Sequence, residues 1–190
     1  MACPDLAASA VGQSIVAVSP GIDGTGMLTV VDITEETSRS IPVDGDVRVL
    51  VDTGGDRALL NTTSQSSTTG LEFSIVDLTS GAIAPIETPQ LAGSSMRVTG
   101  GGLSPDGTQV VLIVTSRDDP NGHLLVVADI APDGSAGPLA VLATGREFAP
   151  NDGDQTIKPA GLGWSAEIVW TPTALIYSLG PNGITTVPLL

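Results

Sequence analysis

Two aspartates near residue 150 are the first candidates for a chemical role. Asp152 and Asp154 lie on either side of Gly153, in a segment where oxygen-bearing side chains recur. Calcium takes roughly six to eight oxygen ligands, and short aspartate-rich loops can supply several of them. The segment lacks the further acids and the bidentate glutamate of an EF-hand loop. A solvated acidic turn is the simpler interpretation, and a calcium site at these two aspartates is the alternative.

Catalysis by a histidine or a zinc ion finds little support. His123 is the only histidine and Cys3 the only cysteine, so a zinc site would need mostly carboxylate ligands. No Gly-x-Ser-x-Gly segment is present to expose a nucleophilic serine. Because His123 follows Gly122 at the start of an expected strand, we expect an exposed turn residue there. We therefore predict no catalytic residue and no cofactor.

Paired carboxylates for glycoside hydrolysis are also poorly supported. Such sites need two acids that flank the sugar. The six glutamates lie mostly in or beside expected turns: Glu35, Glu36, Glu72, Glu87, Glu147 and Glu167. Aromatic residues make up only 3% of the chain, which leaves few to form a sugar platform.

The one local enrichment in aromatic residues lies near the C-terminus. Trp164, Trp170 and Tyr177 fall within a stretch of fourteen residues. Packing within the last structural unit is the simpler role for them. An exposed aromatic pair would instead be a natural anchor for a partner protein.

The charge of the chain excludes several classes of partner. The chain has 21 acidic and 7 basic residues, which gives a net charge of −14. So acidic a surface repels phosphate backbones and anionic lipid, which disfavours binding to nucleic acid or to a membrane surface. No phosphate-binding loop, dinucleotide fingerprint or basic patch is present.

The sequence carries only weak signals of where the protein is located in the cell. The longest unbroken apolar run, residues 110–114, is too short to span a bilayer. The N-terminus has no charged region followed by a long apolar one, so no signal peptide is recognisable. A cysteine as early as Cys3 could mark the lipid-anchored start of a mature lipoprotein, whereas an unmodified thiol is the simpler interpretation. The sparing use of lysine and asparagine suggests a bacterial source.

The elements that must position these residues are strands. Apolar residues make up 41% of the chain and charged residues 15%, and 23 glycines and 14 prolines punctuate the sequence. This composition is too apolar for a disordered chain and suits many short strands separated by turns. Residues 109–115 and 123–129 are apolar strands joined by a polar loop, and a Ser-Pro-Asp-Gly turn precedes them.

This pattern repeats along the chain. Asp32, Asp77 and Asp129 each end an apolar strand, precede a polar turn and are followed by one more strand. They lie 45 and 52 residues apart, the period of four-stranded propeller blades. We expect one domain over residues 1–190, with units at about 14–43, 47–86, 97–143 and 160–187. The first unit is expected to lack its innermost strand, which residues 5–11 could supply weakly, and the last unit its outermost.

The repeats resemble a known family. The Leu-Ser-Pro-Asp-Gly turn at residues 103–107, flanked by apolar strands and followed by an Asp at the end of the third strand, is similar to the WD-repeat-like blades of TolB-type β-propellers. The resemblance is strongest over residues 47–143 and implies an all-β, propeller-like fold of about four blades. Such a chain is a small closed ring, an open arc, or a segment of a longer propeller. We favour the small ring, because open apolar edges promote aggregation.

These observations predict a non-catalytic, protein-binding or accessory module outside the cytoplasm of a bacterium. The acidic turns on the loop-bearing rim would be offered to a partner of complementary charge. The alternative is a propeller enzyme, or a protein that binds calcium or a small ligand at an aspartate-lined site.

Overall fold

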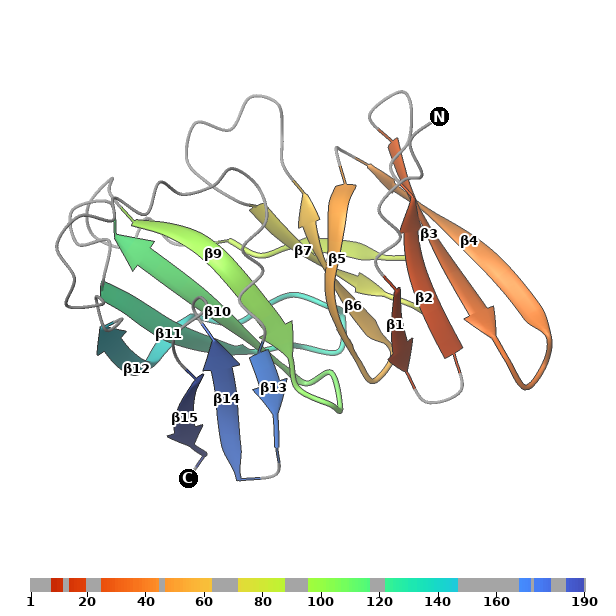
Figure 1. The fold of residues 1–190 in the computed structure, drawn as a ribbon. Helices are drawn as coiled ribbons and strands as arrows, with labels where there is room; N and C mark the ends of the chain where they lie inside the picture. The colour runs from red at the N-terminus through yellow and green to blue at the C-terminus, as the bar shows by residue number, and fades with distance from the viewer. Residues whose placement is uncertain are drawn as a thin grey trace, which may run out of the picture.

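The structure, a computed structural model, consists of β-strands joined by turns (Figure 1). It describes residues 8–11, 14–19, 25–44, 47–62, 72–87, 96–116, 122–146, 168–171, 173–178 and 184–189. Within these ranges there are fifteen strands and no helix. The predicted all-β fold class is confirmed.

The strands form four antiparallel sheets in chain order, each from consecutive strands. Sheet one contains β1 (Ala8–Val11), β2 (Ser14–Ser19), β3 (Thr25–Asp32) and β4 (Thr37–Asp44). Sheet two contains β5 (Val47–Gly54), β6 (Arg57–Thr62), β7 (Glu72–Asp77) and β8 (Ile83–Pro85). Sheet three contains β9 (Met96–Leu103), β10 (Gln109–Ser116), β11 (Gly122–Asp129) and β12 (Ala140–Arg146). Sheet four contains β13 (Ile168–Trp170), β14 (Ala174–Ser178) and β15 (Ile184–Pro188).

Two strands differ from the sequence prediction. Sheet one is complete, because β1 pairs with β2 along its whole length, from Ala8 opposite Ala17 to Val11 opposite Ser14. The sequence predicts the fourth strand of sheet three at residues 138–143, whereas the strand begins at Ala140. The chain between β11 and β12 first forms a turn, held by a bridge between Ile130 and Ala136. The predicted strand at 160–167 lies outside the described residues.

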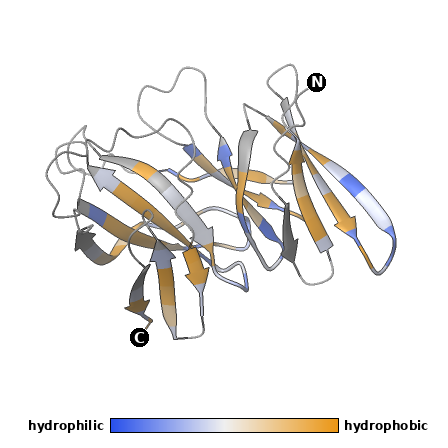
Figure 2. Cartoon of the chain, viewed as in Figure 1, coloured by the Kyte–Doolittle hydropathy of each residue, from blue (hydrophilic) through white to orange (hydrophobic). Residues whose placement is uncertain are grey.

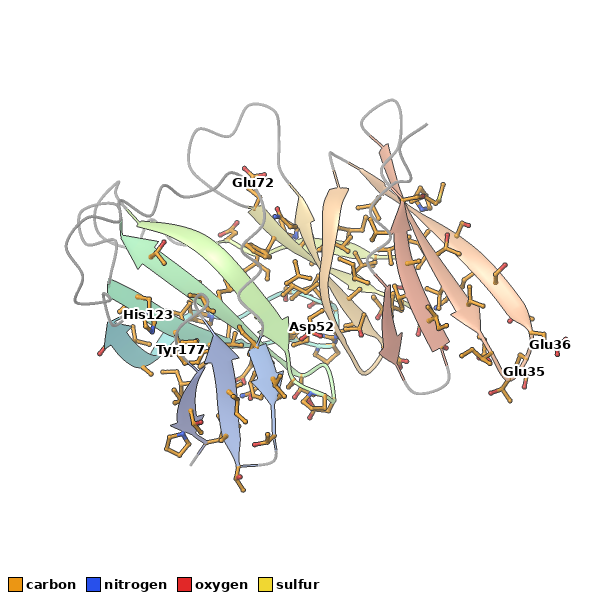
Figure 3. All side chains as sticks on the ribbon, in the orientation of Figure 1. Glu35, Glu36, Asp52, Glu72, His123 and Tyr177 are labelled. Atoms are coloured by element: carbon orange, nitrogen blue, oxygen red, sulfur yellow. The ribbon has the colours of Figure 1, made fainter. Side chains whose placement is uncertain are left out.

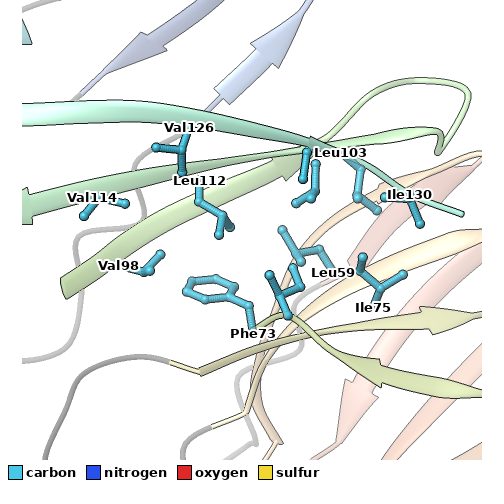
Figure 4. Close-up of a cluster of buried hydrophobic side chains, with 12 residues drawn as sticks. Leu59, Phe73, Ile75, Val98, Leu103, Leu112, Val114, Val126 and Ile130 are labelled. Atoms are coloured by element: carbon cyan, nitrogen blue, oxygen red, sulfur yellow. The ribbon is translucent and has the colours of Figure 1, made fainter. Parts of the chain in front are cut away.

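The core consists of three apolar clusters, one between each pair of successive sheets. Val16 and Leu28 of sheet one meet Leu60 of sheet two in the first cluster. Figure 4 shows the second cluster, between sheets two and three, where Phe73 lies close to Val98. The third cluster joins sheets three and four and includes Val111, Ile113, Leu125, Leu175 and Tyr177. The sheets therefore stack face to face in sequence order, like propeller blades.

This stacking explains why the strands differ in hydrophobic pattern (Figure 2). In β2 the buried Val16 and Val18 alternate with more exposed residues, because sheet one is packed against a neighbour on one face. In β10 all residues from Val110 to Val114 are buried, because one set faces sheet two and the other faces sheet four. A continuous apolar run is the sequence signature of such a doubly covered strand.

The first strands of the four sheets line the inside of the arrangement. β1 contacts β5, β5 contacts β9, and β9 contacts β13. Apolar clusters of described residues join sheets one and two, two and three, and three and four, but no such cluster joins sheet four to sheet one. The described strands therefore form an arc of four sheets and not the closed ring that the sequence favoured.

Candidate binding surface

One edge of the first three sheets carries short turns, which together we call the turn rim. In an antiparallel sheet of four strands, the turn between the first and second strands and the turn between the third and fourth lie at the same end. The turn rim accordingly comprises residues 33–36, 55–56, 78–82, 104–108 and 130–139. Figure 1 shows the β3–β4, β5–β6 and β9–β10 turns on the lower side of the molecule.

Aspartates at the ends of the third strands shape these turns. The carboxylate of Asp32 accepts hydrogen bonds from the backbone N–H groups of Thr34 and Glu35, at 2.9 and 3.0 Å. Asp77 does the same with Thr79 and Ser80, at 2.8 and 2.6 Å. The bond from the Ser80 N–H is the main reason that the pKa of Asp77 lies below its ordinary value. The predicted equivalence of these two aspartates is confirmed in their bonding as well as their position.

Asp129 ends β11 at the equivalent place but has a different partner. It accepts a hydrogen bond from the Gln109 side chain at 2.9 Å. The turn that follows is held by Asp133, whose carboxylate accepts from the hydroxyl and the N–H of Ser135 at 2.6 and 3.0 Å. These bonds lower the pKa of Asp133, so this turn also carries an ionised carboxylate at neutral pH.

The Ser-Pro-Asp-Gly turn is closed by its own side chains. The Ser104 hydroxyl donates to Asp106 at 2.6 Å, and this bond is the main cause of the lowered pKa of Asp106. The same carboxylate accepts from the N–H and hydroxyl of Thr108, at 3.1 and 2.8 Å. Gly107 has a φ of 72°, a conformation that glycine adopts without the clash of a Cβ atom.

Hydrogen bonds to backbone carbonyls join these turns to one another. The Gly55 N–H donates to the Pro105 carbonyl at 2.9 Å, which links sheets two and three. The Arg57 guanidinium donates to the Ala131 carbonyl at 2.8 Å and makes a second link between the same sheets. The Arg39 side chain donates to the Thr79 carbonyl at 2.8 Å and links sheet one to sheet two. The turn rim of the first three sheets is thus one continuous, preorganised surface.

The turn rim is strongly acidic. The described acidic residues on the turn rim and at the strand ends beside it are Asp32, Glu35, Glu36, Asp56, Asp77, Asp106, Asp129 and Asp133. Two arginines, Arg39 and Arg57, lie beside them and are engaged with backbone carbonyls. Glu35 and Glu36 are exposed at the tip of the β3–β4 turn, and Figure 3 shows them at the opposite side of the molecule from Glu72. Such a surface attracts a cationic partner over a distance of about one Debye length, roughly 8 Å in physiological salt.

Asp52 is an acidic residue whose role the sequence did not indicate. It lies on the innermost strand β5, and its carboxylate accepts from the N–H of Leu103 on β9 and from the N–H of Thr53, both at 2.8 Å. Burial raises the pKa of Asp52, although the two hydrogen bonds oppose that effect. Gly102 makes room for it, since a Cβ there would lie 3.2 Å from an Asp52 carboxylate oxygen. The Asp52 side chain thus joins two innermost strands, β5 and β9, by a hydrogen bond.

The prediction of an exposed His123 is wrong. His123 is 7% exposed, and its Nε2 lies 2.7 Å from the Tyr177 hydroxyl, with the two rings edge to face (Figure 3). β11 already begins at Gly122, so His123 is a strand residue on the face that packs against sheet four. Burial lowers the pKa of His123 and favours the neutral imidazole.

The aromatic residues predicted as a partner anchor are placed differently from one another. Tyr177 is buried in the third cluster, and Trp170 is half-buried and packs against the same cluster. Trp164 lies outside the described residues. Partner binding through these aromatic residues stays a prediction.

The remaining predicted sites lie outside the described part of the chain. This holds for the candidate calcium ligands Asp152 and Asp154 and for Cys3. In the described ranges, no three His, Cys, Asp or Glu residues are grouped as metal ligands would be. The same ranges contain no helix long and apolar enough to cross a membrane.

Comparison with known proteins gives matches in structure but not in sequence. No protein-family model and no curated protein sequence matches the chain. A chain from a structural and mechanistic analysis of two prolyl endopeptidases matches with a TM-score of 0.53 and 17% identity, over 95% of this chain and 26% of that one. The β-propeller domain of the Trilobed protease from Pyrococcus furiosus, described as having an open velcro topology, matches with a TM-score of 0.51 and 9% identity, over 90% of this chain and 48% of that one. TolB from Acinetobacter baumannii has a TM-score of 0.48 and 14% identity, over 97% of this chain and 42% of that one.

The chain spans about a quarter of the length of the matched prolyl endopeptidase chain and about half of the Trilobed protease domain. At these identities the likeness concerns the fold alone. The successive stacking of small antiparallel sheets, with the first strand of each sheet on the inside, agrees with it. The predicted resemblance to a β-propeller family is confirmed as one of fold: this is an all-β chain whose sheets are arranged like the blades of a β-propeller.

Proposed function

We propose that this chain is a non-catalytic module that binds another protein through its turn rim. The observation that carries the proposal is the acidic, hydrogen-bonded belt of turns around Asp56, Asp77 and Asp106. A preorganised surface loses little conformational entropy on binding. Its charge favours a partner with a basic surface, and attraction of this kind raises the association rate and falls with added salt.

The module would act outside the cytoplasm of a bacterium, as an accessory part of a larger assembly. If Cys3 carries a lipid, the acidic body would be held beside the membrane without binding its anionic surface. Fractionation of the source cells, with mass spectrometry of the N-terminal peptide, tests both parts of this proposal.

The binding experiment compares charge reversals on the turn rim with a charge reversal at the other end of the strands, which we call the opposite rim. The full chain is immobilised and exposed to an envelope extract, and captured proteins are identified with and without cross-linking. A variant with Glu35→Lys, Glu36→Lys and Asp56→Lys should lose a partner that the wild type retains. Glu87→Lys, an exposed acid beyond the end of β8 at the opposite rim, is the matched control and should retain it. Recovery of the chain alone, or equal binding by both variants, contradicts the proposal.

A second candidate function is binding of calcium or a small ligand beside the innermost strands. The observation that favours it is the Asp52 carboxyl, which lies half-buried on the innermost strand β5 beside β9. A ligand that binds only the folded state raises the melting temperature by mass action. A melting temperature that rises with calcium, and no longer rises after Asp52→Asn, would support this function over protein binding.

A further inference from the structure

The described side chains on the outer face of sheet one are uncharged, and Asp44 at the end of β4 is the one acidic position that the strand register places on this face. The outer face is turned away from sheet two, and Ile15 and Met27 on it are each 38% exposed. The described side chains of this face, which we call the first end face, are Ile15, Ala17, Ser19, Met27, Thr29, Val31, Ser38, Ser40 and Pro42. None of them can be charged, although 15% of the chain is Asp, Glu, Lys or Arg.

The outer face of sheet four has the same character. It is turned away from sheet three, and Val169 on it is 55% exposed. The described side chains of this second end face are Val169, Ala174, Ile176, Thr186 and Pro188. The described side chains of both end faces are therefore uncharged, whereas the turn rim is acidic.

The two end faces correspond to the two sides of an interface that the chain already makes three times. At each junction between two sheets, the earlier sheet packs with one particular face on the later sheet. That face carries Val16 and Val18 in sheet one, Leu59 in sheet two and Val111 in sheet three. The second end face, with Ile176, is the same side of sheet four. The later sheet packs with its other face, which carries Leu60 in sheet two, Leu112 in sheet three and Leu175 in sheet four. The first end face, with Ile15, is the corresponding face of sheet one.

We propose that a second copy of this chain occupies both end faces, head to tail. The second end face of each copy packs on the first end face of the other and continues the stacking that joins the sheets within one chain. Two arcs of four sheets give a ring of eight, which is within the range of about four to eight blades that propellers use. In a chain with a net charge of −14, uncharged faces are where two copies can approach with the least repulsion.

This pairing is independent of partner binding through the turn rim, and salt distinguishes the two. Added salt weakens an attraction between opposite charges but not the burial of apolar surface, and it screens the repulsion between two acidic chains. We therefore expect the dimer to persist, or to become tighter, at a salt concentration that releases a partner from the turn rim.

The test is the mass of the full chain in solution, measured by sedimentation over about a hundredfold range of concentration. The expected result is a species of twice the 19.1 kDa chain mass. Val169→Lys and Met27→Lys each place a charge in both junctions of the ring and should weaken the dimer at least about tenfold. Val141→Lys is the matched control, because Val141 on β12 is 57% exposed and lies on neither end face. It should leave the dimer intact.

A charge pair tests the orientation of the two copies. In a head-to-tail ring, Met27 of one copy lies on the face opposite that of Val169 in the other, so the double variant Met27→Lys with Val169→Glu should recover most of the dimer. Circular dichroism confirms that each variant is folded. A monomer throughout the concentration range, an equal effect of Val169→Lys and Val141→Lys, or chains of more than two copies would overturn the proposal.

Discussion

At the scale of single residues, the turn after each third strand has one position in the left-handed conformation. Gly81 occupies it in sheet two with a φ of 77°, whereas Glu36 occupies it in sheet one with a φ of 50°. A left-handed conformation costs an L-residue about 1–2 kcal/mol, and glycine avoids that cost but gives up roughly 0.5–1 kcal/mol through its greater freedom when unfolded.

We therefore expect Glu36→Gly to stabilise the fold by up to about 1 kcal/mol. Gly81→Ala should destabilise it by about 1 kcal/mol, because the left-handed cost outweighs the lower freedom of unfolded alanine and the new Cβ would also lie 3.3 Å from Ile41. Urea unfolding measures both changes. If Glu36→Gly lowers the free energy of unfolding as much as Gly81→Ala does, the equivalence of the two turns is contradicted.

His123 gives the fold a dependence on pH. Its pKa is lowered in the folded protein from an ordinary value of 6.5, so the unfolded chain takes up a proton at higher pH than the folded one. The contribution of His123 to stability is therefore complete above about pH 6.5 and is lost as the pH falls toward the folded pKa. Protonation would also add a charge beside Nδ1, which is buried without a hydrogen-bond partner in the described structure.

Thermal unfolding between pH 7 and 5 measures this dependence. His123→Gln keeps a polar group near Tyr177 but cannot titrate. We expect this variant to lose less stability than the wild type across that range. Parallel pH profiles for the two proteins would show that His123 is not the group responsible.

The residues that sequence reasoning misplaced are those whose surroundings depend on a neighbouring sheet. The face of β11 that carries His123 packs against sheet four, and the alternation of apolar residues cannot reveal this when both faces of a strand are covered. Asp52 places a polar side chain among the apolar residues of its strand, and this pattern could have indicated a role for it. Its partner, the Leu103 N–H, is 51 positions away in the sequence. The aspartates that act within their own turns, Asp32 and Asp77, were recognisable because their partners are local.

At the scale of elements, the turn of β9–β10 is fitted against the turn of β5–β6. A Cβ on Gly107 would clash with the Gly54 carbonyl, whereas a Cβ on Gly134 would meet only Ala84, at 3.8 Å. Both glycines have positive φ, at 72° and 88°, so an alanine has a similar backbone cost at each.

Gly134→Ala should therefore cost up to about 1 kcal/mol, which is the cost of the left-handed conformation less the freedom that alanine lacks in the unfolded chain. Gly107→Ala should cost clearly more, because the two turns must also separate. Chemical denaturation of the two variants side by side measures the difference. Equal losses would mean that the close fit of these turns contributes nothing to stability.

Asp52 makes the corresponding connection on the inside of the arc. Asp52→Ala leaves the N–H of Leu103 without its acceptor, and we expect a loss of about 1–3 kcal/mol. Asp52→Asn retains an acceptor oxygen and should cost less. The two free energies of unfolding, measured at neutral pH, check this order. An alanine variant as stable as the asparagine variant would show that the bond to Leu103 does not stabilise the arc.

Most elements were predictable because their signals are local. Strands such as β6 and β10 have turn residues at both ends and a period or apolar run that excludes a helix. β1 was only weakly indicated, because Ala8–Val11 consists mostly of small residues that give no clear strand signal. Its pairing with β2 defines it as a strand. The start of β12 was misplaced because the turn at residues 130–139 is closed by backbone bonds that leave little trace in the sequence.

At the scale of the whole molecule, the sequence indicated the number of units but not how they close. Repeats at a propeller period predict that sheets stack in series, and the three clusters agree with that prediction. Closure depends on the angle between successive sheets, which small differences in side-chain volume along each cluster determine. Neither the composition nor the repeat period of the sequence encodes this angle. The closed ring that the sequence favoured and the observed arc are therefore both compatible with the same repeat pattern.

The central claim is that the four sheets stack in sequence order, each packed on the next. Nuclear Overhauser effects between methyl-labelled side chains test this most directly. We expect contacts between Val16 and the Leu60 cluster, between sheets two and three, and between Leu125 and Leu175, and none between sheet one and sheet three. Contacts from Val16 or Leu28 to Leu112 or Val126, as two layers in a sandwich would give, would contradict the account.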